Sequence, residues 1–221
     1  MSENLADFLP ALILAKTVSL NNFMKKLIGI ILLILFFSCK SEKYIYENNR
    51  FNNIEKFNIK RAIKFEEKRK ATNTTPEHKV SLEKGIYPNT KEIKLETPIS
   101  YEKNIQGNFV LETKYFYSKS DSLVKVILYQ WTNPSFKDFM SELKIDKKKN
   151  KEKFENKFKL IEREIIKILG NPDIANHNQD QFPYTRNDRK WLKNKKTKAY
   201  LFKGNHEPSG NYHIELAIYS E

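Results

Sequence analysis

The sequence predicts an α+β fold, in which an antiparallel sheet of about five strands carries a long helix on one face. Three patterns support this prediction. Residues 109–131 contain two β-rich runs separated by a short polar turn. Residues 154–168 place apolar side chains at helical spacing, and residues 212–219 alternate apolar and polar side chains as a half-buried strand does. The order hairpin, helix and three-strand meander lays the helix across the sheet.

Composition indicates a packed domain preceded by a targeting segment. The chain has 221 residues, of which 39% are hydrophobic, and it includes fifteen Phe and eleven Tyr. Aromatic residues at this frequency offset chain entropy in a core, so the composition excludes a disordered protein. The formal charge of +13 favours an anionic partner. However, the richness in Asn, Ile, Phe and Tyr is typical of an AT-rich genome, which raises the lysine content without a functional cause.

The N-terminal part of the chain carries an export signal. Lys25 and Lys26 precede an uninterrupted apolar run at residues 27–37. Secretory signals have apolar runs of about 7–15 residues, whereas a helix that spans a bilayer needs about 20. Ser38 and Cys39, the only cysteine, follow this run. The sequence FFSC at residues 36–39 resembles the lipobox of bacterial lipoproteins, although common lipoboxes have a leucine and a small residue where this chain has two phenylalanines.

The resemblance to lipoproteins implies that signal peptidase II cleaves between Ser38 and Cys39 and that Cys39 then carries the lipid. It also implies a cell-envelope location, which we expect to be the outer membrane of a Gram-negative bacterium. With no second cysteine, a disulfide is excluded, and an unmodified thiol would be a liability in an oxidising envelope. An uncleaved signal anchor or an ordinary secreted protein are the alternatives.

Four segments are therefore expected along the chain. Residues 1–23 are acidic where a signal should be basic, so we interpret them as an upstream over-extension of the reading frame. Residues 24–38 form the signal peptide, residues 39–75 a lipidated and partly helical tether, and residues 76–221 the globular domain. A weak helical pattern covers residues 54–71.

Strand signals follow the tether. Short β-like runs lie at residues 80–82 and 91–95, with the turn sequence GIYPNT between them. Residues 109–117 and 123–131 then form a hairpin through the polar connection SKSDS. The second of these runs is apolar on both faces, which predicts a central strand and leaves its pairing register open.

A helical region extends over residues 136–169. As one straight helix it would be about 50 Å long, while a domain of this size has a radius of gyration of about 14 Å. A break is therefore expected at residues 146–150, and Gly170 supplies the stop. The second piece carries one apolar stripe, which consists of Phe154, Phe158, Ile161, Ile165 and Ile168.

Three further strands close the predicted sheet. They are centred on Trp191, on residues 199–202 and on residues 212–219, with turn sequences KNKK and GNHEPSGN between them. The last strand places Tyr212, Ile214, Leu216 and Ile218 on one face, which we expect to be buried.

The sequence predicts no catalytic residue, metal site or cofactor. The four histidines form no HExxH pair, and the chain has neither a glycine-rich phosphate loop nor a GxSxG sequence. A metal held by His206, Glu207 and His213, which bracket one loop, is the alternative for those residues. An envelope hydrolase is the alternative function, and its candidate residues are His177, Asp173, Asp180 and Asp188.

The sequence therefore favours a lipid-anchored, non-enzymatic binding or accessory module. One candidate surface is the basic hairpin around Trp191, and another is the side of the sheet that the helix leaves open. Lysines also cluster at residues 146–153. Besides the membrane that holds the lipid anchor, the expected partner is an envelope protein, an anionic glycan or lipopolysaccharide, and nucleic acid is not expected in the envelope. A solvated lysine-rich surface without a ligand is equally consistent with these clusters. The candidate residues are Trp191, Lys193, Lys195 and Lys196 for the hairpin, and Tyr115, Tyr129, Trp131 and Tyr200 for the open side.

Overall fold

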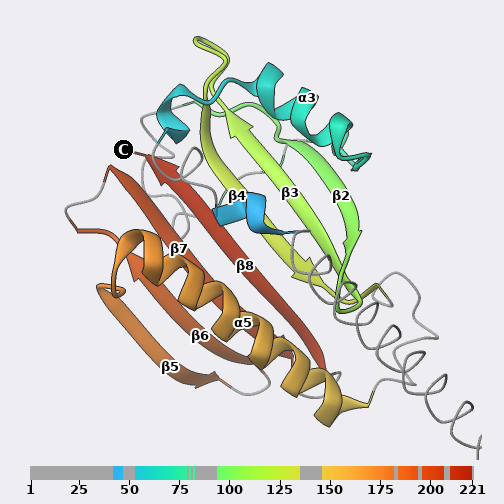
Figure 1. The fold of residues 1–221 in the computed structure, drawn as a ribbon, viewed down its shortest axis with the longest axis vertical. Helices are drawn as coiled ribbons and strands as arrows, with labels where there is room; N and C mark the ends of the chain where they lie inside the picture. The colour runs from blue at the N-terminus through green and yellow to red at the C-terminus, as the bar shows by residue number, and fades with distance from the viewer. Residues whose placement is uncertain are drawn as a thin grey trace, which may run out of the picture. The chain divides into compact units, whose positions relative to one another are not determined.

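The computed structural model describes residues 42–46, 53–78, 80, 82, 94–134, 146–181, 184–193, 196–206 and 210–220. Only the backbone is described for Lys43, residues 177–181, Tyr184 and His206. Residues Tyr44–Glu221 form one compact unit. Within its described part, one antiparallel sheet carries two α-helices on the same face, so the predicted α+β class and antiparallel sheet are confirmed (Figure 1).

The sheet has eight strands in the order β1-β2-β3-β4-β8-β7-β6-β5. Sequential strands are neighbours except at the centre, where the C-terminal strand pairs with β4 and joins two four-stranded meanders (Figure 1). The strands are β1 (Thr72–Asn73), β2 (Ile99–Ile105), β3 (Phe109–Tyr117), β4 (Val124–Thr132), β5 (Ile174–Gln181), β6 (Tyr184–Trp191), β7 (Thr197–His206) and β8 (Asn211–Ser220).

The expectation of about five strands is wrong, because β1, β2 and β5 also belong to the sheet. Strand β5 has the sequence IANHNQDQ and lies at a sheet edge, where side chains need not be apolar. Strand β2 has the sequence ISYEKNI, whose polar residues weakened its strand signal. Of the two short runs expected at residues 80–82 and 91–95, the described part shows one β-bridge, between Leu95 and Ser118.

The hairpin of β3 and β4 is confirmed, and its register is now fixed. Tyr115 lies opposite Ile127, and Leu111 lies opposite Trp131. Strand β4 is central and carries buried side chains on both faces, as its apolar sequence predicted. The turn is closed by Asp121, whose Oδ1 accepts a hydrogen bond from the backbone N–H of Leu123 at 2.9 Å.

Helix α5 (Lys147–Leu169) begins where the break was expected, since Asp146 caps it by accepting a hydrogen bond from the backbone N–H of Lys149 at 3.1 Å. It ends at Gly170, whose φ of 76° favours glycine. Residues 135–145 lie outside the described part. The stripe is buried as predicted, except that its last buried member is Leu169, while Ile168 is half-buried.

Helix α3 (Ile59–Lys68) follows two short 3₁₀ helices, η1 (Lys43–Tyr46) and η2 (Ile54–Lys56). The helix expected over residues 54–71 is interrupted because Asn58 forms a β-bridge with Leu123. Side chains from this region enter the core, so the expected boundary at residue 76 is wrong and the domain begins at Tyr44. The buried side chains are Tyr44, Ile45, Ile54, Ile59 and Ala62.

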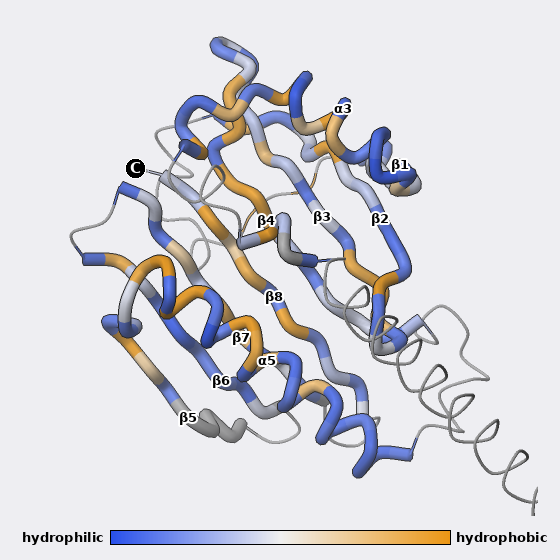
Figure 2. The backbone as a smooth tube through the Cα atoms, in the orientation of Figure 1, coloured by the Kyte–Doolittle hydropathy of each residue, from blue (hydrophilic) through white to orange (hydrophobic). Residues whose placement is uncertain are grey.

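Two apolar clusters lie on opposite faces of the sheet. The larger one fills the space between the sheet and the helices, and the smaller one is centred on Phe116, Leu128 and Phe202 on the other face. Figure 2 shows hydrophobic residues concentrated in the central strands, while α5 alternates between hydrophobic and hydrophilic residues along its length. We call the two sides the helix face and the opposite face.

Candidate functional site

Two carboxylates of α5 turn inward and neutralise cations of the sheet. Glu162 pairs with Arg189 of β6, and Glu155 pairs with Lys203 of β7. The side chains of Arg189 and Lys203 are 7% and 5% exposed, respectively. Arg189 also donates from Nη1 to the backbone carbonyl of Asp188 at 2.8 Å. A buried cation is costly without a partner, so these two glutamates are held toward the sheet.

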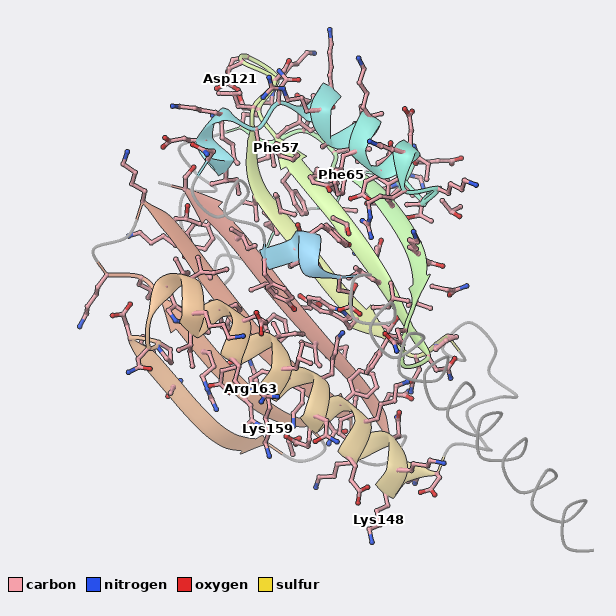
Figure 3. The ribbon with its side chains drawn as sticks, viewed as in Figure 1. Phe57, Phe65, Asp121, Lys148, Lys159 and Arg163 are labelled. Atoms are coloured by element: carbon pink, nitrogen blue, oxygen red, sulfur yellow. The ribbon has the colours of Figure 1, made fainter. Side chains whose placement is uncertain are left out.

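The outer side of α5 is therefore left almost entirely basic. Glu164 is engaged by Lys167 at 2.6 Å, and Glu152 is the one exposed glutamate in the helix. Figure 3 labels three of the exposed cations, which extend along α5 over about 22 Å at 1.5 Å per residue. Within the described part, five exposed cations of α5 have no carboxylate partner, namely Lys148, Lys149, Lys151, Lys159 and Arg163.

Helix α3 shows the same segregation of charge. Glu66 is 1% exposed and turns inward, where Oε1 accepts from the Tyr115 hydroxyl at 2.5 Å and Oε2 pairs with Arg69 Nη1 at 3.0 Å. Glu67 is the one exposed carboxylate of this helix. Five exposed cations lie in α3 or directly after it and have no partner in the described part, namely Lys60, Arg61, Lys64, Lys68 and Lys70.

We call these ten cations of α3 and α5 the basic helix face. Both helices cover the same side of the sheet, so the fields of the ten side chains add on that side (Figures 1 and 3). On the opposite face, Arg186 pairs with Asp188 at 2.7 Å and Lys114 pairs with Glu112 at 3.0 Å. These two cations of the opposite face are paired with carboxylates, whereas the ten of the basic helix face have no carboxylate partner in the described part of the chain.

The predicted basic hairpin lies beside the C-terminal end of α5. Its turn is held by Asp173, whose Oδ2 accepts from the backbone N–H groups of Leu192 at 2.6 Å and Lys193 at 2.8 Å. Trp191 donates from Nε1 to the carbonyl of Gly170 at 2.8 Å and is fully buried. Trp191 is therefore a core residue and cannot offer a stacking surface. Lys193 and Lys196 are exposed, and Lys195 lies outside the described residues.

The expectation that Tyr115, Tyr129 and Trp131 line the open side of the sheet is wrong. All three are fully buried in the cluster beneath the helices, where Tyr115 bonds to α3 and the Trp131 ring lies 5.8 Å from Lys157 of α5. Strand β4 is apolar on both faces, so its sequence could not show which face the helices cover. Tyr200 is on the opposite face, as expected.

The opposite face holds a compact group around Tyr200. Its ring packs 5.4 Å from Phe202, and its hydroxyl accepts a hydrogen bond from Arg186. Burial raises the pKa of Tyr200 to about 12, which keeps the hydroxyl protonated. His213 packs edge-on against Phe202 at 5.8 Å, and burial, with a smaller effect of Arg186, lowers its pKa. Tyr200 and Phe202 are buried, and Arg186 and His213 are half-buried against them, so these contacts form a packing arrangement.

Of the four residues proposed for hydrolysis, the two whose side chains the structure describes, Asp173 and Asp188, have separate structural contacts. Asp173 closes a turn, Asp188 pairs with Arg186, and the side chains of His177 and Asp180 lie outside the description. Among the described residues, no three His, Cys, Asp or Glu side chains are grouped closely enough to hold a metal ion. Glu207 and the side chain of His206 also lie outside the described residues. Of the alternative metal site on that loop, only the His213 side chain is therefore described.

A hollow of about 550 Å³ lies at the turn of β3 and β4. In it, the Oγ atoms of Ser118 and Ser120 are 2.7 Å apart, and Lys125 pairs with Asp121 at 2.7 Å. A nucleophilic serine needs an adjacent general base, and the lining contains no histidine. The lining residues are Lys94, Glu96, Ser118, Lys119, Ser120, Asp121 and Lys125.

Ser38 and Cys39, the predicted cleavage and lipid-attachment residues, lie outside the described residues. No helix in the described part of the chain has both the length and the hydropathy of a membrane span. No protein-family model, curated protein sequence or solved structure matches the chain. The basic helix face is therefore the feature on which we build a functional proposal.

Proposed function

We propose that the chain is a lipid-anchored module of the cell envelope that binds a polyanion through its basic helix face and catalyses no reaction. The anchor is the lipid on Cys39, on the strength of the FFSC sequence and the apolar run before it. The observation that carries the binding proposal is the segregation of charge. The inner glutamates of α3 and α5 pair with groups of the protein interior, whereas ten outer cations have no carboxylate partner among the residues that the structure describes.

The electrostatics of this face suit a repeated anion better than a small molecule. The cations are spread along two helices and are exposed to water, and none of them lines the hollow at the turn of β3 and β4. Single exposed ion pairs contribute little, about 0–1 kcal/mol, but many of them acting on one polymer add up. Because exposed charges are screened within about 10 Å at 0.1 M salt and about 3 Å at 1 M, binding must weaken steeply with salt.

The test uses heparin as a soluble model polyanion and the mature lipoprotein in a neutral detergent. We expect the double variant Lys159→Gln/Arg163→Gln to bind heparin more weakly than the parent at low salt. The matched control, Lys114→Gln/Lys190→Gln, removes the same charge from the opposite face and should bind nearly as the parent does. Equal weakening in both variants would show that total charge, and not the basic helix face, attracts the polymer.

The anchor is tested separately by mass spectrometry of the detergent-extracted protein. We expect the N-terminal peptide of the mature protein to begin at Cys39 and to carry the added mass of acyl chains. Recovery of peptides from residues 24–38 in the mature protein would contradict cleavage by signal peptidase II.

A further inference from the structure

The chain enters the folded domain on the helix face. Tyr44 and Ile45 of η1 are 8% and 0% exposed and belong to the cluster between the helices and the sheet. The Tyr44 ring lies 5.4 Å from that of Phe65 in α3, and the guanidinium of Arg69 lies 3.4 Å from the Tyr44 ring centroid. The first buried residues of the domain are thus fixed next to α3, on the side that carries the basic helix face (Figure 1).

The link from the anchor to this point is short. Tyr44 is five residues after Cys39 in the sequence. An extended chain covers at most about 3.5 Å per residue, so five residues span at most about 18 Å. If the opposite face lay on the membrane, the sheet, about 10 Å thick, would lie between Tyr44 and the lipid. The link would then have to run from the helix face around the edge of the sheet.

Charge favours the same orientation. Basic residues near an anionic membrane surface favour the docked state by about fivefold each, and the effect decays within a Debye length. The basic helix face has ten such residues, whereas Lys114 and Arg186 on the opposite face are paired with carboxylates. Leu160, which is 42% exposed, lies on the outer side of α5 between Lys159 and Arg163 and offers an apolar contact to an interface.

We infer that the ligand of the basic helix face is the anionic headgroup layer of the membrane that holds the anchor, so that the domain lies with α3 and α5 toward the bilayer. This inference rests on the proposed function, because the short link constrains orientation only if Cys39 is lipidated. We infer a lipid surface and not a soluble acidic glycan, because the link keeps Tyr44, which lies on the helix face, within about 18 Å of the lipidated Cys39.

The test measures which face lies near the lipid. Because Cys39 is the only cysteine, an introduced cysteine is the single free thiol of the lipidated protein. One variant, Leu160→Cys, places a fluorophore on the basic helix face, and another, Asn104→Cys, places it on an exposed position of the opposite face. Both proteins are reconstituted into vesicles of phosphatidylcholine alone or mixed with phosphatidylglycerol, with a quencher attached to the lipid headgroups.

We expect strong quenching at position 160 in the phosphatidylglycerol vesicles, weak quenching at position 104, and loss of the difference at high salt. Adding Lys159→Gln and Arg163→Gln should lower the ratio of docked to undocked domain by about 25-fold, at about fivefold for each residue. The control pair Lys114→Gln/Lys190→Gln should leave that ratio unchanged.

Each contrary result has a separate meaning. The membrane inference would be overturned by equal quenching at both positions, or by quenching that does not depend on phosphatidylglycerol while heparin binding persists. The polyanion-binding proposal would then stand with a soluble glycan as the ligand. If the parent protein itself takes up a thiol-reactive dye at Cys39, the anchor is absent, and both the proposed function and this inference are overturned.

Discussion

The ion pair between Glu162 and Arg189 allows a quantitative test of how α5 is held on the sheet. Replacing Glu162 by Gln removes the carboxylate that pairs with the Arg189 guanidinium from α5, and the Arg189 side chain is only 7% exposed. Breaking a fully buried pair costs about 3–5 kcal/mol. Glu162 is itself 20% exposed, and Arg189 keeps its hydrogen bonds to the carbonyls of Asn176 and Asp188. We therefore expect a loss of about 2–3 kcal/mol in the free energy of unfolding.

Urea unfolding followed by circular dichroism measures this loss. With a slope of about 2 kcal/mol per molar, the midpoint should fall by about 1–1.5 M. The control Glu152→Gln removes the same charge from the exposed side of α5 and should change stability by less than about 0.5 kcal/mol. Adding Arg189→Met to Glu162→Gln should recover most of the loss, because the buried positive charge is then gone. Equal losses in Glu162→Gln and Glu152→Gln would refute the reasoning.

Three further predictions follow from buried contacts. In Gly204→Ala, the new Cβ would lie 2.3 Å from Cε1 of His213, so we expect about 1–3 kcal/mol of destabilisation in urea unfolding, relieved by adding His213→Ala. Burial lowers the pKa of Lys153 to about 8 from 10.5, so the charged form of Lys153 destabilises the folded state below pH 8. The free energy of unfolding should therefore rise between pH 8 and about 10, and this rise should be absent in Lys153→Met. Residues 80–221 alone should show no cooperative thermal transition by circular dichroism, whereas residues 44–221 should show one. The reason is that the segment before residue 80 supplies core side chains such as Ile45, Ile54 and Ile59. A cooperative transition in the shorter chain would refute this.

The elements that the sequence predicted well have local signals. The hairpin of β3 and β4 shows in its two β-rich runs, and α5 shows in its apolar stripe and its stop at Gly170. Strand β5 lacks any such signal, because its sequence of Asn, Gln and Asp is typical of a loop and its pairing depends on β6. Strand β2 depends similarly on β3 for its pairing. Which strands pair depends on tertiary contacts, and the pattern of residues within one strand carries little information about its partner.

The candidate site was predictable only in part, because sequence shows where cations are but not which acids neutralise them. The lysine clusters near Lys148 and Lys193 were visible, yet the inward direction of Glu155 and Glu162 was not. A signal did exist: both glutamates flank the apolar stripe of α5, and Arg189 lies two residues before the buried Trp191, on the same face of β6. Charged residues on the same face as core residues indicate buried ion pairs, and such pairs fix which side of a helix remains basic.

The composition drift expected of an AT-rich genome can account for the number of lysines in this chain, but it does not account for their arrangement. Compositional drift adds lysines without regard to the fold, so unpaired cations would be spread over both faces of the sheet. Instead, Lys114 and Arg186 on the opposite face are paired, and Lys190 packs 4.5 Å from the Tyr200 ring. The unpartnered cations of α3 and α5 gather on the helix face, which is also where Tyr44 brings in the chain from Cys39. Drift predicts neither feature, whereas a domain that docks its helices on an anionic surface near its anchor requires both.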